Sequence, residues 1–180
     1  MRNLILVSLL ALAFSCSNVG KFQEAINTLS TDWDAATAQV TEAVNKISQT
    51  QDMAKSALSA MNPDETVMAK LTDEQKTKID ELKQGVQGQM ASLGQLAQTA
   101  FEFVSKWQKE GENMEALKEG LANKKLPKDV QATIDNLKAM ATTGTENAAS
   151  WNEQASAAAD AANQASQAYN ELISAAGAAK

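Results

Sequence analysis

Carboxylates are the most numerous side chains in this sequence that could carry out chemistry. They form the pairs Asp32 with Asp34, Asp64 with Glu65, Asp73 with Glu74 and Asp80 with Glu81, and the cluster Glu110, Glu112, Glu115 and Glu119. Paired carboxylates hydrolyse glycosides, and carboxylate-rich loops bind calcium. None of these groups has the spacing of an EF-hand loop, and adjacent residues on a helix point about 100° apart. We interpret them as helix starts and solvated helix faces, and we expect no metal site.

The sequence has no histidine and a single cysteine. Histidine is the commonest general base and a common transition-metal ligand, so its absence removes Ser-His-Asp and Cys-His sites together with Cys/His zinc sites. Gly85 and Gly88 are too few to form a GxGxxG or Walker-type phosphate loop. We therefore expect no enzymatic activity, no catalytic residue, no cofactor and no small-molecule substrate.

The single cysteine, Cys16, directly follows an export signal. Arg2 and the free amino terminus form a short positive region, and an apolar run interrupted only by Ser8 extends from Leu4 to Phe14. This order is typical of a secretory signal. The run is shorter than the roughly 20 apolar residues that span a bilayer, and no later stretch is apolar enough to span one.

Residues 1–16 resemble a bacterial lipoprotein precursor. Ser15 followed by Cys16 matches the end of a lipobox, whereas Ala13 stands where leucine is common and Phe14 where a small residue is usual. The resemblance implies that residues 1–15 are a cleaved signal peptide and that the thiol of Cys16 receives an acyl chain such as palmitate. That chain would anchor the protein in a membrane of the cell envelope, the outer membrane if the bacterium is Gram-negative.

Ordinary secretion is the alternative to lipidation. Ala11-Leu12-Ala13 and Ala13-Phe14-Ser15 both fit A-x-A-type cleavage sites. Cleavage there would give a secreted soluble protein with a free thiol near its N-terminus. The position of the lone cysteine at the cleavage point favours lipidation, because this cysteine has no intramolecular disulfide partner.

Composition favours a helical protein with an acidic surface. The formal net charge of −6 becomes −7 when Arg2, the only arginine, leaves with the signal. Nucleic acids and anionic lipid surfaces attract clustered lysine and arginine, so we expect no nucleic-acid partner and membrane contact through the acyl anchor alone. The chain has only three Trp, one Tyr, four Phe and two Pro. Such a composition predicts an all-α fold with little or no sheet.

Apolar residues recur at alternating intervals of three and four, which is the pattern of a continuous stripe along a helix. This pattern predicts helices over about 19–61, 73–122 and 127–177. The first seam is Val19, Phe22, Ile26, Leu29, Trp33, Ala36, Val40, Ala43, Ile47, Thr50, Ala54, Ala57 and Met61. The second is Ile79, Leu82, Val86, Gln89, Leu93, Leu96, Ala100, Phe103, Trp107, Glu110, Met114, Leu117 and Leu121. The third is Val130, Ile134, Leu137, Ala141, Gly144, Ala148, Trp151, Ala155, Ala158, Ala162, Ala165, Tyr169, Leu172 and Ala176.

Aromatic residues could form a carbohydrate platform or a ligand pocket. Core packing is indicated instead for the Trp and Phe residues that fall on the seams, which are Phe22, Trp33, Phe103, Trp107 and Trp151. Phe101 is the exception, because it lies beside the second seam.

Polar and proline residues mark the predicted turns. Asn62 is expected to cap a short turn of helix with Pro63 at its first position, and Pro127 is expected to open the third long helix. Thr72 and Gln75 have the spacing of a capping box at the start of the second.

Glycines mark the weaker parts of the helices. Gly85, Gly88 and Gly94 lie off the second seam and each costs about 1 kcal/mol relative to alanine. A break near Gly111 would divide the second helix and give four helices, and the residues around Gly144 are the weak point of the third.

Three long helices joined by short turns predict an antiparallel bundle with coiled-coil-like heptad seams. Residues 16–180 would form a single elongated domain, a rod of roughly 65 to 75 Å at 1.5 Å per residue. Antiparallel register places Trp33 and Trp107 in one layer, with Trp151 near Leu96.

We predict a lipid-anchored, non-catalytic helical rod of the bacterial cell envelope. It would act as a structural or protein-interaction module, with an unidentified protein partner or through self-association. One alternative is a membrane-active helical protein, a pore-former or lipid carrier, suggested by the uncharged but glutamine-rich stretch Gln84 to Phe101. Another is a periplasmic chaperone-like holdase with a concave helical face.

Overall fold

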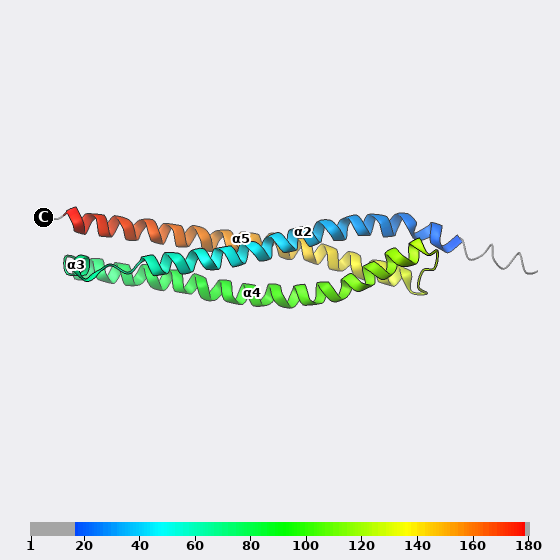
Figure 1. Cartoon of the computed structure of the whole chain (residues 1–180), viewed down its shortest axis with the longest axis horizontal. Helices are drawn as coiled ribbons and strands as arrows, with labels where there is room; N and C mark the ends of the chain where they lie inside the picture. The colour runs from blue at the N-terminus through cyan, green and yellow to red at the C-terminus, as the bar shows by residue number, and fades with distance from the viewer. Residues whose placement is uncertain (1–16, 179–180) are drawn as a thin grey trace, which may run out of the picture. The chain divides into compact units, whose positions relative to one another are not determined.

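The computed structural model describes residues 17–178, and the side chains of residues 19–176. Within that range the chain forms the helices α2 (Ser17–Ala60), α3 (Glu65–Met68), α4 (Asp73–Ala122) and α5 (Val130–Ala178) (Figure 1). No strand occurs among these residues. The prediction of an all-α protein is confirmed. Cys16 and the predicted signal peptide, residues 1–15, lie outside the described residues.

Helix α4 occupies the predicted range 73–122 without a break, so the predicted alternative of a division near Gly111 is wrong. One glycine costs about 1 kcal/mol of helix stability. Met114 and Leu117 follow Gly111 on the buried face of α4 and are 2% and 0% exposed. Burial of each of these side chains stabilises the helix by about 1.5 to 3 kcal/mol. Burial therefore outweighs the helix propensity of Gly111.

The start of α4 has the predicted capping box. The backbone N–H of Gln75 donates to Thr72 Oγ1 at 3.2 Å, and the backbone N–H of Thr72 donates to Gln75 Oε1 at 2.9 Å. These bonds satisfy two backbone N–H groups that the first turn of a helix leaves without partners.

The predicted cap of the short helix is wrong by two positions. Asp64 is the N-cap of α3, and its Oδ1 accepts from the Val67 amide at 2.9 Å. Pro63 precedes this cap, so it lies outside the helix. Asn62 Oδ1 instead accepts from Lys83 Nζ on α4 at 2.9 Å, a partner far away in sequence.

The prediction that Pro127 opens the third long helix is wrong. Helix α5 begins three residues later, at Val130. Leu126 packs against the hydrophobic core beneath the connection, and a Cβ on Gly120 would lie 3.0 Å from the Lys125 carbonyl oxygen. The connection therefore lies tightly over the end of α4 before the chain can turn into α5.

The chain divides into two compact units. Unit 1 contains the described part of Met1–Val40 together with Phe103–Asn147, and unit 2 contains Thr41–Glu102 together with the described part of Ala148–Lys180. Each of the three long helices contributes a segment to both units.

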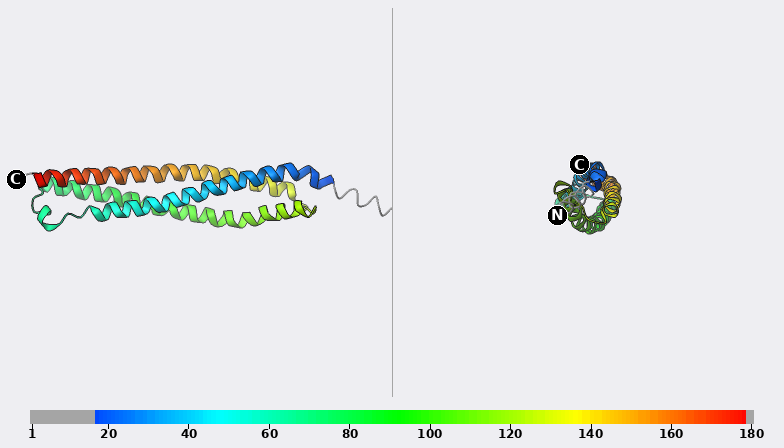
Figure 2. Two further views of the ribbon diagram at one scale, coloured as in Figure 1. Left: turned by 45° about the horizontal axis from the view of Figure 1, so that its top comes forward. Right: turned by 90° about the vertical axis from the view of Figure 1, so that its right-hand side faces the viewer.

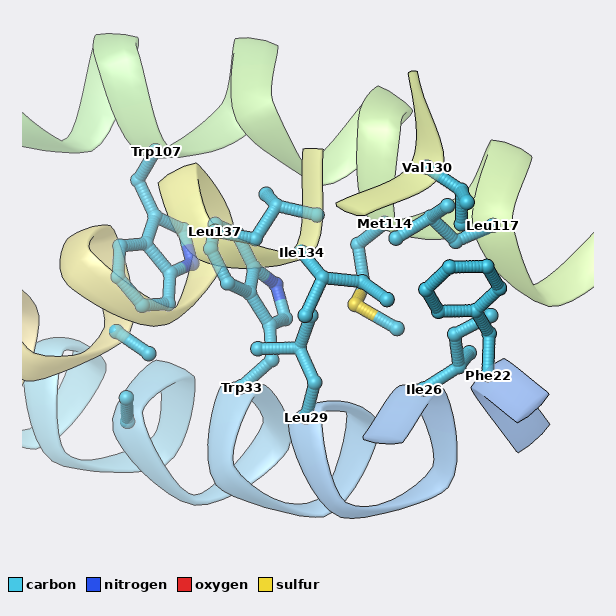
Figure 3. Packing of buried hydrophobic residues seen from close by; sticks show 12 residues of the cluster. Phe22, Ile26, Leu29, Trp33, Trp107, Met114, Leu117, Val130, Ile134 and Leu137 are labelled. Atoms are coloured by element: carbon cyan, nitrogen blue, oxygen red, sulfur yellow. The ribbon is translucent and has the colours of Figure 1, made fainter. Parts of the chain in front are cut away.

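The core of unit 1 is built from large apolar residues of all three long helices. Figure 3 shows Phe22, Ile26, Leu29 and Trp33 from α2 packed against Trp107, Met114 and Leu117 from α4 and against Val130, Ile134 and Leu137 from α5. All of these side chains are at most 9% exposed.

The core of unit 2 contains more small residues. It comprises Ala54, Met61, Leu71, Ile79, Val86, Ala162, Ala165, Tyr169 and Ala176. Helix α3 lies in the connection between α2 and α4 at the end of this unit (Figure 2). Alanine buries little area, so this core gains less hydrophobic free energy per residue than that of unit 1.

The predicted seams account for most of the buried surface. Every seam residue is buried or half-buried, including Gln89 and Glu110, which interrupt the second seam and are half-buried. Leu71 is a core residue that the seams omit, because it belongs to the turn before α4.

Candidate functional site

Cys16 is the one site residue predicted from the sequence, and it lies outside the described residues. Helix α2 is described from Ser17, the residue that follows Cys16 in the sequence.

An aromatic layer lies in the core of unit 1. Trp33 and Trp107 stack with their ring centroids 3.9 Å apart and their planes at 14° (Figure 3). They are 6% and 5% exposed. This contact confirms that the two indoles share a layer, and their burial confirms core packing over an exposed carbohydrate platform. Phe101, beside the seam, is 67% exposed, as its position predicts.

Thr37 completes the polar bonding of this layer. Trp107 Nε1 donates to Thr37 Oγ1 at 3.1 Å, and Thr37 Oγ1 donates to the Trp33 carbonyl oxygen at 2.7 Å. A buried indole N–H needs an acceptor, and this hydroxyl supplies it across two helices. Sequence analysis missed Thr37 because it lies one position beyond the seam residue Ala36.

Gly144 provides the space for the Trp107 ring. A Cβ built on Gly144 would lie 2.6 Å from Trp107 Cζ3, closer than carbon atoms can approach. Gly144 is therefore required by packing, and α5 continues through it as a helix. The aromatic layer is thus a filled part of the core with no space for a ligand.

The carboxylates lie at helix starts and on helix surfaces. Asp73 and Glu74 occupy the first turn of α4, where acidic residues interact favourably with the helix dipole. The Thr66 hydroxyl and the Val67 amide both donate to Asp64, and these bonds lower the pKa of its carboxyl group below the ordinary value of 3.8. Among the described residues, no group of three or more His, Cys, Asp or Glu side chains could hold a metal ion.

Three pockets differ in charge. One of them, about 670 Å³ in unit 1, is lined by Lys21 from α2 and by Lys124, Lys125 and Lys128 from the α4–α5 connection, with Asp129 as its one acidic residue. We name it the basic pocket. The other two are smaller, about 480 and 460 Å³, and their linings carry both signs of charge.

Sequence analysis missed the basic pocket. It interpreted the stretch Lys124-Lys125-Leu126-Pro127 only as a turn and assigned no role to Lys21. The paired lysines within that stretch were a visible signal, but only the packing of α2 against the connection shows that Lys21 joins them.

No protein-family model matches the chain, and neither a curated protein nor a solved structure matches it. The described helices include none that is both long and apolar enough to cross a membrane.

Proposed function

We propose that this protein is a lipid-anchored, non-catalytic helical rod of the bacterial cell envelope that serves as a structural or protein-interaction module. The observation that carries the proposal is the order of residues 1–16, a positive start and an apolar run followed by the only cysteine, which is typical of an export signal. Helix α2 is described from Ser17 onward, so an anchor on Cys16 would lie close in sequence to the folded domain.

We further propose that the three long helices form an antiparallel bundle with coiled-coil-like seams. Two contacts of unit 1 support this arrangement. Trp33 stacks on Trp107, whereas Figure 3 shows Phe22, which precedes Trp33, beside Leu117, which follows Trp107. Contacts that move forward along α2 and backward along α4 are those of antiparallel helices. The burial of the seam residues supports the heptad pattern.

The positions of the aromatic and acidic side chains support an interaction role. The aromatic residues on the seams, the residues that would most readily bind a ligand, are engaged in packing, and the carboxylates are distributed over helix surfaces. A protein of this kind would bind its partner through the exposed faces of its helices.

Replacement of Cys16 tests the anchor. In the native host, Cys16→Ser should move the protein from the membrane fraction to the soluble fraction and abolish incorporation of labelled palmitate. A double variant, Cys16→Ser with Asn18→Cys, is the matched control, because it keeps one thiol but moves it away from the predicted cleavage point. It should behave like Cys16→Ser.

Membrane association that persists in Cys16→Ser would contradict the proposal. Acylation of the double variant would show that any thiol near this terminus is modified, and would contradict the lipobox as the determinant. A wild-type mature protein with the mass of an unmodified Cys16 would support secretion instead.

A further inference from the structure

The basic pocket concentrates positive charge on a protein that is acidic as a whole. Its lining contains four lysines and one acidic residue, Asp129, whereas the whole chain has 16 basic and 22 acidic residues. The exposed ammonium groups come from two segments that lie far apart in sequence, Lys21 in α2 and the three lysines of the α4–α5 connection.

These lysines are free to bind an external anion. None of the four forms a salt bridge within the described part of the chain. The one interaction that involves them besides backbone hydrogen bonds places Lys21 Nζ 5.3 Å from the centroid of the Phe22 ring. Elsewhere Lys76, Lys78 and Lys118 each pair with a carboxylate. Four lysines against the single carboxylate of Asp129 give the lining of the pocket an excess of positive charge.

The backbone at Lys124 places a lysine where glycine is the preferred residue. Lys124 has φ 54°, the only positive φ of a non-glycine residue in the described range. It holds this conformation in a Schellman motif, in which the Lys124 and Lys125 amides donate to the carbonyl oxygens of Leu121 and Gly120 at 3.2 and 2.8 Å. A left-handed conformation is unfavourable for a side chain with a Cβ, so this position disfavours lysine on structural grounds.

Apolar residues share the pocket with the lysines. Val19, Phe22, Leu126 and Pro127 contribute to its lining. Such an arrangement, apolar side chains bordered by long lysine side chains, suits the boundary between lipid headgroups and acyl chains.

The pocket lies at the end of unit 1 from which the signal and Cys16 extend in sequence. Figures 1 and 2 show the start of α2, in dark blue, beside the yellow-green connection between α4 and α5. Val19 and Phe22, which follow Cys16 by a few residues, line the pocket. Helix α5 also begins at this end of unit 1, and helix N-termini favour negative charge.

We propose that the basic pocket binds the headgroups of anionic phospholipids in the membrane that holds the Cys16 anchor. The lysines would give a second, electrostatic attachment beside the acyl chain, and they would orient unit 1 with the α4–α5 connection toward the lipid. This proposal rests on the proposed function. It also revises the expectation that the acyl chain alone contacts the membrane, because the lysine cluster exists only in the folded protein.

The proposal is tested by measuring how fast each lysine of the full protein, isolated from its host, is acetylated when the protein is bound to lipid vesicles. The protein is combined with vesicles of phosphatidylcholine alone, or of phosphatidylcholine with phosphatidylglycerol, and treated with an uncharged acetylating reagent. Mass spectrometry then gives the reactivity of each lysine. Lys21, Lys124, Lys125 and Lys128 should react about fivefold more slowly in the anionic vesicles, the factor that corresponds to about 1 kcal/mol per lysine. High salt should restore their reactivity, because about 1 M salt shortens the Debye length to about 3 Å.

Four exposed lysines elsewhere in the chain serve as internal controls. Lys55, Lys70, Lys106 and Lys109 form no salt bridge among the described residues and should react equally in both kinds of vesicle. Equal reactivity of the basic-pocket lysines in both vesicles would overturn the proposal. A decrease shared by all eight lysines would also overturn it, since that would show adsorption without a specific surface.

Matched variants give a second measurement. Lys21→Gln, Lys124→Asn, Lys125→Gln and Lys128→Gln are combined, with asparagine at residue 124 because it tolerates the left-handed conformation. The control replaces Lys55, Lys70, Lys106 and Lys109 by glutamine. Both combinations are made in the Cys16→Ser protein. The basic-pocket combination should reduce binding to anionic vesicles, and the control combination should not. An equal loss of binding in the two would overturn the proposal.

The two proposals fail separately. An unmodified Cys16 with protected basic-pocket lysines would contradict the acyl anchor alone. An acylated Cys16 with equally reactive lysines would contradict the headgroup surface alone and would leave an acidic protein as the partner to seek for the pocket.

Discussion

At Gly144 the helix α5 has room for a hydrogen atom and nothing larger beside the Trp107 ring. We expect Gly144→Ala to be less stable than Gly94→Ala by about 1 to 3 kcal/mol, the usual cost of overpacking a core. Gly94 is the matched control, because its Cβ would meet no atom within 4 Å and both substitutions gain the same helix propensity. Urea unfolding of the two variants measures the difference, and equal midpoints would show that the Trp107 ring can move away at no cost.

Tyr169 should make the protein sensitive to alkaline pH. Burial and, secondarily, the negative charge of Asp64 raise its pKa above the ordinary value of 10.0. The unfolded chain therefore loses the phenolic proton first, so Tyr169 has no effect on stability below about pH 10 and lowers it as the pH rises further.

The only tyrosine in the chain makes this effect directly measurable. Phenolate absorbance should titrate at a higher pH in the folded protein than in urea. Tyr169→Phe should remove the part of the alkaline destabilisation that depends on the phenolic proton. Coincident titrations of folded and unfolded protein would contradict the raised pKa.

At the scale of the elements, Lys124 after the end of α4 is a position where glycine would be more favourable than the residue present. Lys124→Gly should stabilise the protein by about 1 kcal/mol, because glycine adopts the left-handed conformation without the cost imposed by a Cβ. Lys125→Gly is the matched control, since Lys125 has no positive φ and glycine there only increases the freedom of the unfolded chain. Thermal unfolding should rank Lys124→Gly above the wild type and Lys125→Gly below it. The reverse order would contradict the strain at Lys124.

The helix ends show what local sequence can determine. Thr72 and Gln75 form the predicted capping box because both partners lie within one turn of each other. At Asn62 and Pro127 local signals pointed to the wrong residues. Asn62 instead accepts from Lys83, and the start of α5 depends on how Leu126 packs over the end of α4.

At the scale of the whole molecule, the proposed antiparallel rod makes a prediction for scattering in solution. A three-helix rod of about 65 to 75 Å has a radius of gyration of about 21 Å, whereas a compact globular domain of this size has about 15 Å. Small-angle X-ray scattering of the Cys16→Ser protein in the monomeric state distinguishes them. A value near 15 Å would contradict the rod and, with it, the proposed role as a structural module.

The sequence by itself determined the helices and the faces that they bury. The spacing of three and four residues identifies a buried stripe from one chain segment alone, which is why the seams agree with the observed burial and why the layer of Trp33 and Trp107 could be predicted. The prediction of an anchor on Cys16 also rests on the sequence alone, because the pattern of a signal peptide lies in its linear order, and it stays a prediction.

Only the tertiary structure decided which residues from different helices meet. The bond from Trp107 to Thr37, the need for glycine at residue 144 and the gathering of Lys21 with the lysines of the α4–α5 connection all depend on the approach of segments far apart in sequence. Helical periodicity says which side of a helix faces the core. Which atoms meet across that side depends on how neighbouring helices rotate and pack against one another, and the sequence of a single segment does not contain this information.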